Sequence, residues 1–254
     1  MVHCDCRKKR SVKRRTTPKR MRTGFLAAWS AIAVLLLGVS SAAVRAEPQA
    51  VGLELAFVVD ASGSIDEAET KLQRQGYLEA LVNDRVLSAI TGGLHGSIAA
   101  AYIEFAADGC ARLSVPWTRI HDKASAKAFG EQILQQPQLF CPGGNAISEA
   151  LTFAAESMGA NAFRGVRRVI DISGDGPNTL GGPVRVARDF IVAQGIVING
   201  LVIERPSMPD LDVYYRNAVT GGPGSFVINA ETRSTFAQAI LKKMILEIAQ
   251  KPAD

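Results

Sequence analysis

The sequence predicts an α/β domain with a doubly wound, mostly parallel six-stranded sheet, helices on both faces and one antiparallel edge strand. Short apolar runs alternate with amphipathic stretches of helical length along residues 50–254. Strands that are apolar on both faces are typical of parallel sheets covered by helices, and the strand–helix alternation is typical of doubly wound folds. The turn at residues 107–110 is too short for a parallel crossover, so it predicts a hairpin between the second and third strands.

The first strand is expected at residues 53–59, which are nearly all apolar and end at Asp60. A helix is expected from about Asp66, because acidic residues fill a first turn where the helix dipole favours negative charge. Similar patterns predict strands at 98–105 and 112–115, helices at 122–135 and 146–158, a strand at 167–173, a helix at 183–194, a strand at 197–203, a short helix near 211–218, a strand at 225–228 and a helix at 232–249. No repeat or linker divides this stretch, so a single domain is expected over residues 47–254.

Residues 1–46 have the three-part layout of a secretory signal peptide. Ten basic side chains lie in residues 1–22, residues 25–44 carry no charge, and small residues precede Arg45 and Ala46. The alternative is a retained membrane anchor, since about 20 uncharged residues can span a bilayer. Met21 is an alternative translation start, because Met21 and Arg22 would begin a compact signal. The expected location is therefore periplasmic or secreted, with a membrane contact only if the apolar segment is retained.

The net charge of the chain argues against a nucleic-acid partner once the signal is removed. The 254 residues carry +5 with a pI near 9.1, a balance that would ordinarily raise that possibility. Loss of residues 1–46 removes eleven bases and one acid, which leaves 18 bases against 23 acids and a net charge of −5. The hydrophobic fraction of 47% also excludes a disordered chain.

Three loops at or beside the carboxyl ends of the central strands carry oxygen ligands. In doubly wound sheets, ligands bind beyond those ends, and oxygen-only ligand sets suit hard cations such as Mg²⁺, Mn²⁺ or Ca²⁺. Taken alone, each loop is also what a helix cap or turn requires. Together and in this order they predict a metal site. The loops are Asp60-Ala61-Ser62-Gly63-Ser64, Gly143-Gly144-Asn145-Ala146-Ile147-Ser148 and Ser173-Gly174-Asp175-Gly176-Pro177-Asn178.

Over residues 51–250 the chain resembles the von Willebrand factor type A (vWA) domain, and within that family a group of secreted bacterial proteins of unassigned function. The family carries a metal-ion-dependent adhesion site (MIDAS). Its parts are Asp-x-Ser-x-Ser, a Thr in a later Gly-Gly-Thr loop, and an Asp before Gly after the fourth strand. The matching positions are Asp60, Ser62, Ser64, Asn145 and Asp175.

The resemblance implies a role for each of these residues. Ser62 and Ser64 would bind the cation directly, and Asp60 and Asp175 would hold it partly through water. An open coordination position would accept a carboxylate from a protein ligand, whose identity the sequence leaves open. Asn145 departs from the family's Thr. An amide oxygen can coordinate Mg²⁺ or Ca²⁺, but it reaches further than a hydroxyl, so whether Asn145 is a ligand stays open.

Two cysteines, Cys110 and Cys141, remain after the signal is removed. An even pair in an oxidising compartment indicates one disulfide; two unpaired buried thiols are the alternative. Closing a loop of about 30 residues would contribute roughly 3–4 kcal/mol. In the fold that the resemblance implies, both cysteines lie on the metal-site face, so the bridge would brace the loop that carries Asn145.

An enzyme is the alternative function. A strand that ends in Asp60 is also similar to the start of the haloacid-dehalogenase-type phosphatases, but those place an acid/base Asp two residues later, where this chain has Ser62. The chain lacks the Gly-x-Ser-x-Gly motif that a serine hydrolase needs. Its remaining histidines, His95 and His121, are expected on the surface. The favoured function is thus an exported, metal-dependent protein-interaction module that is not an enzyme. A divalent-metal hydrolase or phosphatase that uses Asp60 is the alternative.

Asp171 lies inside the fourth predicted strand, where an unpartnered carboxylate would be costly. Two arrangements remain open from the sequence: hydrogen bonding within the metal site, or a polar gap beneath it.

Overall fold

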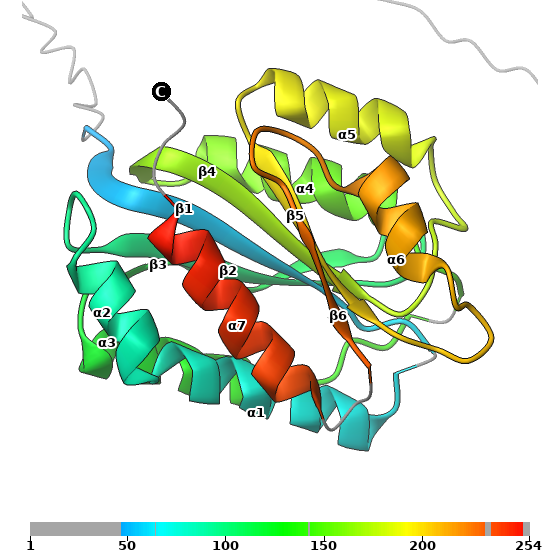
Figure 1. Ribbon diagram of the computed structural model, residues 1–254, viewed down its shortest axis with the longest axis horizontal. Coiled ribbons are helices and arrows are strands. Elements are labelled where there is room, and N and C mark those ends of the chain that lie inside the picture. The colour runs from blue at the N-terminus through cyan, green and yellow to red at the C-terminus, as the bar shows by residue number, and fades with distance from the viewer. Residues whose placement is uncertain (1–46, 64, 142, 232–234, 251–254) are drawn as a thin grey trace, which may run out of the picture. The chain divides into compact units, whose positions relative to one another are not determined.

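The structure is a computed structural model that describes residues 47–63, 65–141, 143–231 and 235–250 (Figure 1). The expected signal peptide, residues 1–46, and Ser64 lie outside these residues. None of the helices described combines the length and the apolar character needed to cross a bilayer.

In the described residues, six strands form one sheet in the order β3-β2-β1-β4-β5-β6. All neighbouring pairs are parallel except β2 and β3, so the predicted hairpin and antiparallel edge strand are confirmed. Several strands are longer than the apolar runs that predicted them. The strands are β1 (Gln49–Asp60), β2 (Ile98–Phe105), β3 (Ala111–Ile120), β4 (Phe163–Gly174), β5 (Val197–Ile203) and β6 (Val227–Ala230).

Helices cover both faces of this sheet, as the sequence predicts (Figure 1). Apolar side chains on one face of the sheet pack against α1 (Glu67–Leu81), α2 (Asp84–Thr91), α3 (Lys123–Leu134) and α7 (Phe236–Ala249). The other face packs against α4 (Ile147–Ala160), α5 (Val184–Ala193), α6 (Leu211–Tyr214) and the π-helical turn Tyr215–Val219. The sheet lies between the two resulting cores. Because β1, β2, β4, β5 and β6 are parallel, their carboxyl ends meet at one edge of the sheet.

The start of α1 shows why the loop after β1 is short. The Asp66 side chain accepts a hydrogen bond from the backbone N–H of Glu69, and the Glu69 side chain accepts one from the N–H of Asp66. This reciprocal cap satisfies two backbone donors at the first turn. The helix therefore begins at the position that the acidic residues predict.

Three details of the fold differ from the sequence-based prediction. The helix α2 was not predicted; it is only eight residues long and begins where the Asn83 side chain accepts the N–H of Arg85. The strand β6 lies two residues later than expected. The stretch predicted as one short helix near 211–218 divides into α6 and a π-helical turn. Short elements carry too little periodicity for their ends to be placed from sequence.

Candidate metal-binding site

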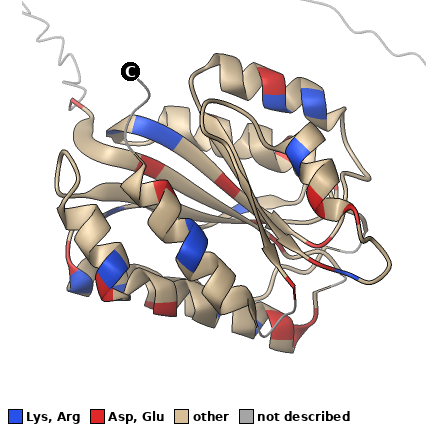
Figure 2. Cartoon of the chain, viewed as in Figure 1, with Lys and Arg blue, Asp and Glu red and all other residues tan. Residues whose placement is uncertain are grey.

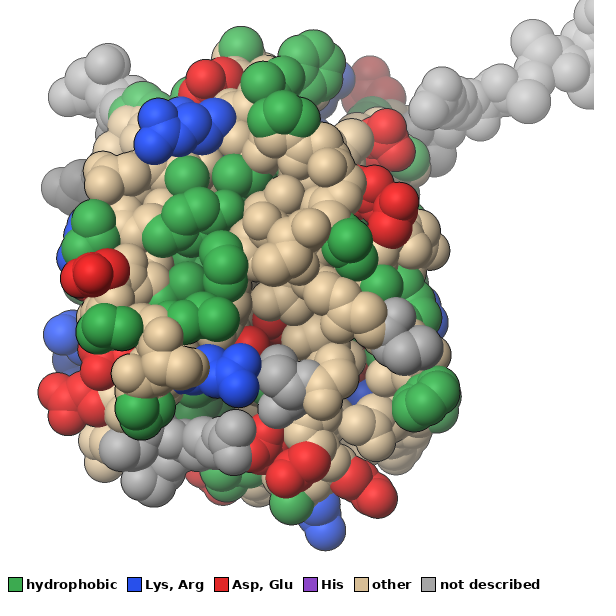
Figure 3. Space-filling model, turned by 90° about the vertical axis from the view of Figure 1, so that its right-hand side faces the viewer, with side chains coloured by type: hydrophobic (Ala, Val, Ile, Leu, Met, Phe, Trp, Pro, Cys, Tyr) green, Lys and Arg blue, Asp and Glu red, His purple; other side chains and the backbone are tan. Residues whose placement is uncertain are grey.

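Three loops that are distant in the sequence are joined at the carboxyl edge of the sheet by backbone hydrogen bonds. The N–H of Ala61 donates to the carbonyl of Phe105 (2.8 Å), and the N–H of Ala146 donates to that of Ala106 (2.9 Å). The N–H of Thr179 donates to the carbonyl of Asn145 (2.9 Å). Figure 3 shows this face, with acidic side chains recessed beside a basic one. The loops after β1, before α4 and after β4 thus form one surface.

Asp60 ends β1 and is only 1% exposed. One carboxylate oxygen, Oδ1, accepts the backbone N–H of buried Ser62 at 2.8 Å. The other oxygen, Oδ2, is buried with no hydrogen-bond partner among the described residues. Burial raises the pKa of Asp60 to about 6; the hydrogen bonds from Ser62 lower it and the negative charge of Asp175 raises it further. A nearby cation would stabilise the charged form of this carboxylate.

Asp175, one residue beyond β4, is equally buried. Its Oδ2 lies 3.3 Å from Nη1 of Arg205, which forms an ion pair with it. The sequence reasoning did not single out Arg205. Its position two residues beyond the end of β5 was the available signal, because that loop also leaves the carboxyl edge of the sheet.

Two glycines let the loops approach this closely. A Cβ on Gly174 would lie 2.5 Å from Oη of Tyr215 and 3.1 Å from Oδ2 of Asp60. A Cβ on Gly176 would lie 2.6 Å from Nδ2 of Asn145. Any larger residue at these positions would push the carboxylate or the amide out of place. The glycines are therefore needed for close packing rather than for backbone freedom.

Tyr215 forms the floor of the site. Its hydroxyl donates to the carbonyl of Gly176 at 3.4 Å and is fully buried. Burial raises the pKa of Tyr215 well above its usual value, and the charges of Asp60 and Asp175 raise it further. Tyr215 is thus a neutral side chain that packs against the two acids.

Asn145 lies next to the loop after β4, and its neighbours are polar. Its backbone N–H donates to Oγ1 of Thr179 at 2.8 Å, and its side chain packs against Gly176. Nearby, the N–H of Ser148 donates to Oδ1 of Asn178 at 2.9 Å. Thr179 and Asn178, which the sequence reasoning did not assign a role, therefore tie the loop after β4 to the start of α4.

The loop before Asn145 is held by a disulfide and by a buried ion network. Cys110 and Cys141 form the predicted disulfide, with Cα atoms 6.5 Å apart. Arg74 and Arg112 both pair with buried Glu104, and both donate to the carbonyl of Pro137, Arg112 at 2.8 Å. The bridge and the arginines together fix the chain on both sides of the hairpin turn.

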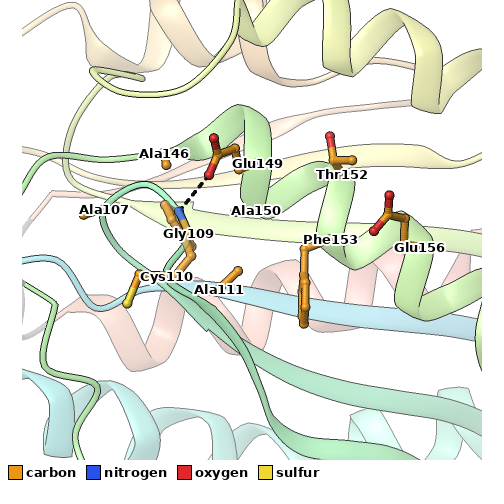
Figure 4. Close-up of a pocket in the computed structure, with 11 residues that line it drawn as sticks. Ala107, Gly109, Cys110, Ala111, Ala146, Glu149, Ala150, Thr152, Phe153 and Glu156 are labelled. Atoms are coloured by element: carbon orange, nitrogen blue, oxygen red, sulfur yellow. Dashed lines mark hydrogen bonds between the residues drawn. The ribbon is translucent and has the colours of Figure 1, made fainter. Parts of the chain in front are cut away.

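A pocket of about 370 Å³ opens beside this loop, between the β2–β3 turn and α4. Figure 4 shows Glu149, Phe153 and Glu156 along one side of α4, and the hydrogen bond of the Gly109 N–H to Oε2 of Glu149 (3.0 Å). The pocket also includes Ala146, the residue after Asn145. A partner that contacts the candidate site would therefore meet a hollow with an apolar floor and an acidic rim.

Asp171 does not belong to the site. Its side chain faces α7, where it forms an ion pair with Lys243. Lys243 is 0% exposed and also pairs with Glu247. Nδ2 of Asn199 donates to Oε1 of Glu247 at 3.0 Å. Figure 2 shows these charged positions on β4 and α7. Asp171 therefore takes neither of the two arrangements that the sequence left open, since it belongs to a filled ionic cluster.

The donor set suits a hard cation better than a transition metal. Across the described residues, no group of three or more His, Cys, Asp and Glu side chains is arranged to hold a metal. His95 and His121 are both exposed, as expected. What converges is two buried carboxylates, the Ser62 hydroxyl and the Asn145 amide, and oxygen donors of this kind fit Mg²⁺, Mn²⁺ or Ca²⁺.

Solved structures with a similar fold include a matrix protein, a von Willebrand factor type A protein and a pilus tip protein. Proximal thread matrix protein 1 from the mussel byssus, described with a zinc-occupied MIDAS motif, is 16% identical with a TM-score of 0.58 over 80% of this chain and 50% of that chain. A von Willebrand factor type A protein from Catenulispora acidiphila is 17% identical, with a TM-score of 0.52 over 81% and 44%. The vWF domain of the type V pili tip protein Mfa5 from Porphyromonas gingivalis is 12% identical, with a TM-score of 0.55 over 80% and 98%.

These comparisons establish a vWA-like fold, and this chain spans about half the length of the mussel protein. A search of curated protein sequences finds no match. A family model described as a protein of unknown function (DUF1194) matches residues 50–252. The chain therefore belongs to this family of unknown function, and its fold is that of a vWA domain.

Proposed function

We propose that this protein is an exported vWA-like module that binds a divalent cation and mediates protein–protein interaction. The proposed ligands are Asp60, Ser62, Ser64, Asn145 and Asp175, with Ser64 assigned from the sequence motif alone. One observation carries the proposal: Oδ2 of Asp60 is buried with no hydrogen-bond partner among the described residues, while a second buried carboxylate, Asp175, raises the pKa of Asp60. Such a pair is costly in itself and is relieved by a cation.

The bound cation, Mg²⁺ or else Mn²⁺ or Ca²⁺, would supply a positive charge and a coordination position for a ligand oxygen. The residues of this chain have separate tasks around it. Asp60 and Asp175 provide negative charge, and the backbone of Ser62 keeps Asp60 in place through Oδ1, which leaves Oδ2 for the ion or its water. Tyr215 and Gly174 close the site from below.

The partner we propose is a protein that offers an acidic side chain to the cation. Apolar residues near the site provide contact area around it: Phe140, beside Cys141, is 89% exposed, and Leu180 is partly exposed next to Gly143. Relatives of the same fold are described as pilus adhesins and a pilus tip protein, which supports an interaction role. The export that such a role needs agrees with the disulfide and with the signal-like residues 1–46.

Calorimetric titration tests the cation site. The wild-type protein is expected to bind Mg²⁺ and Mn²⁺, and Asp60→Ala is expected to lose that binding. Asp189→Ala is the matched control, since Asp189 is an exposed carboxylate on α5 outside the site. Equal affinity in the wild type and Asp60→Ala would exclude this site. Metal-dependent phosphatase turnover by the wild type that Asp60→Ala lacks would instead favour the hydrolase alternative.

The interaction role is tested by capture. Immobilised mature protein is expected to retain a protein in Mg²⁺ that a chelator releases, and Asp60→Ala is expected to retain much less of it. Retention that is the same with chelator and with Asp60→Ala would contradict a metal-dependent interaction.

A further inference from the structure

We infer that Arg205 is an affinity-determining residue of the candidate site: it acts as the counter-ion of Asp175 in the metal-free protein and competes with the divalent cation. This inference rests on the proposed function, since it concerns the same site. It goes beyond that function by assigning a role to a residue outside the metal-ligand motif.

The first step is the position of Arg205. Its loop leaves β5 at the carboxyl edge and is fixed at both ends: the N–H of Glu204 donates to the carbonyl of Ala230 (3.0 Å), and the N–H of Met208 donates to that of Arg205 (2.9 Å). The guanidinium of Arg205 is thereby held at 3.3 Å from Oδ2 of Asp175. Arg205 thus reaches the site from the end of β5, which is not one of the three loops that carry the ligand motif.

The second step is the charge balance. Asp60 and Asp175 are both buried, and they lie close together, since a Cβ on Gly174, the residue before Asp175, would lie 3.1 Å from Oδ2 of Asp60. Two adjacent acids without a cation are unfavourable, and a guanidinium on one of them reduces that cost. The metal-free site is therefore stabilised by a positive charge that the protein itself supplies.

The third step is mobility. The Arg205 side chain is 36% exposed, whereas that of Asp175 is 2% exposed. A partly exposed arginine can rotate into solvent without disturbing the core, and a partly exposed ion pair contributes only modestly to stability. Arg205 can thus be displaced, but it remains a positive charge near the site. Both its pairing with Asp175 and its charge oppose entry of a second cation.

The test compares Arg205→Gln with Arg205→Lys and with Arg216→Gln. Gln removes the charge and leaves a shorter polar side chain, and Lys retains the charge. Arg216 is a matched control because it also pairs with an aspartate, Asp212, and its side chain is half-exposed. Mg²⁺ affinity is measured by calorimetry, and thermal unfolding is measured in chelator and in saturating Mg²⁺.

Arg205→Gln is expected to bind Mg²⁺ about five- to twentyfold more tightly than the wild type, while Arg205→Lys and Arg216→Gln stay within about twofold. In chelator, Arg205→Gln is expected to unfold about 2–4 °C lower, because the ion pair between Asp175 and Arg205 is lost. The rise in unfolding temperature caused by Mg²⁺ is then larger in this variant than in the wild type.

The outcomes separate the two proposals. Binding in the wild type that Asp60→Ala abolishes, with unchanged or weaker affinity in Arg205→Gln, overturns the role of Arg205 and leaves the metal site standing. Binding that only Arg205→Gln shows supports the competition. Absence of Mg²⁺ and Mn²⁺ binding in both the wild type and Arg205→Gln overturns the metal site and this inference together.

Discussion

Two aspartates four residues apart on the same segment of chain, Asp171 and Asp175, are both buried but have different surroundings. Asp171 faces α7, where Lys243 pairs with it inside the core. Asp175 lies just beyond the end of β4, where it forms an ion pair with Arg205, a partly exposed side chain on a loop. In the first case the fold supplies a cation that cannot leave. In the second, the cation is replaceable.

This difference separates a structural charge from the charge that we propose to be functional. The Lys243 cluster contains two acids and one base, and burial together with the charge of Asp171 raises the pKa of Glu247 to about 8. With Glu247 protonated at neutral pH, the cluster carries no net charge. The pair Asp60 and Asp175 is instead balanced by Arg205, a partly exposed side chain that can move into solvent, as we propose for a site that exchanges this charge for a metal ion.

Removing the buried cation should have the largest effect. Lys243→Met leaves Asp171 in the core without its partner, so we expect a loss of about 3–5 kcal/mol in the free energy of unfolding. Chemical denaturation measures it. Lys242→Met is the control, because the neighbouring Lys242 is exposed on the same helix. If both variants lose the same small amount, the cluster is not the structural element described here.

Removal of the disulfide should lower the free energy of unfolding slightly less than Lys243→Met does, and it should have a larger effect on the metal affinity of the site. The bridge closes a loop with a sequence separation of 31, so the Cys110→Ser/Cys141→Ser variant should lose about 3 kcal/mol. Because the bridge lies in the chain that leads to Asn145, Mg²⁺ affinity should fall as well. Calorimetry on the variant at a temperature where it stays folded measures the second effect. Unchanged affinity would show that the Glu104 network alone is enough to hold the loop.

The pH dependence of stability should reveal the Lys243 cluster separately from the candidate metal site. Glu247 has a higher pKa in the folded chain than in the unfolded one, so the folded chain binds more protons between pH 4.5 and about 8. Stability should therefore fall as pH rises through this window and level off above it. The groups that face Glu247 are Asp171, Lys243 and Asn199.

Glu247→Gln should flatten that decline, since its side chain does not titrate. Denaturation of both proteins in chelator at pH 5, 6.5 and 8 measures the effect without a contribution from metal. A decline of the same slope in the variant would assign the pH dependence to other groups.

The smallest expected effect concerns the residue that departs from the vWA pattern. Asn145→Thr replaces an amide packed against Gly176 with a compact hydroxyl. We expect Mg²⁺ affinity to rise about fivefold, which corresponds to about 1 kcal/mol. A loss of affinity on titration with Mg²⁺ would instead identify the Asn145 amide as a metal ligand in its own right.

The sequence was sufficient for the sheet because each central strand is a continuous apolar run, and it was sufficient for the hairpin because the turn before Cys110 is short. It also placed Asp60, Ser62 and Asp175 at strand ends, since these residues follow the apolar runs in a fixed order, while their role as metal ligands stays a prediction. It could not place α2, whose eight residues hold little periodicity, or the exact start of β6.

The environment of the site was beyond sequence reasoning for a different reason. Arg205 and Tyr215 reach the acids from other strands and turns, and nothing in their local sequence marks that contact. The fate of Asp171 depended on Lys243, which is 72 positions away in the chain. A lysine in an amphipathic helix is normally expected on the exposed face, so its burial could be found only from the packed structure.

The strand β4 also fixes the position of the last helix along its own axis. Arg167 donates to the carbonyls of Glu247 (2.8 Å) and Gln250 (2.6 Å) at the end of α7, and Asp171 pairs with Lys243 one turn earlier. A helix advances 5.4 Å per turn, so any axial slip of α7 would break both attachments at once. The two contacts together hold α7 in a single register against the sheet.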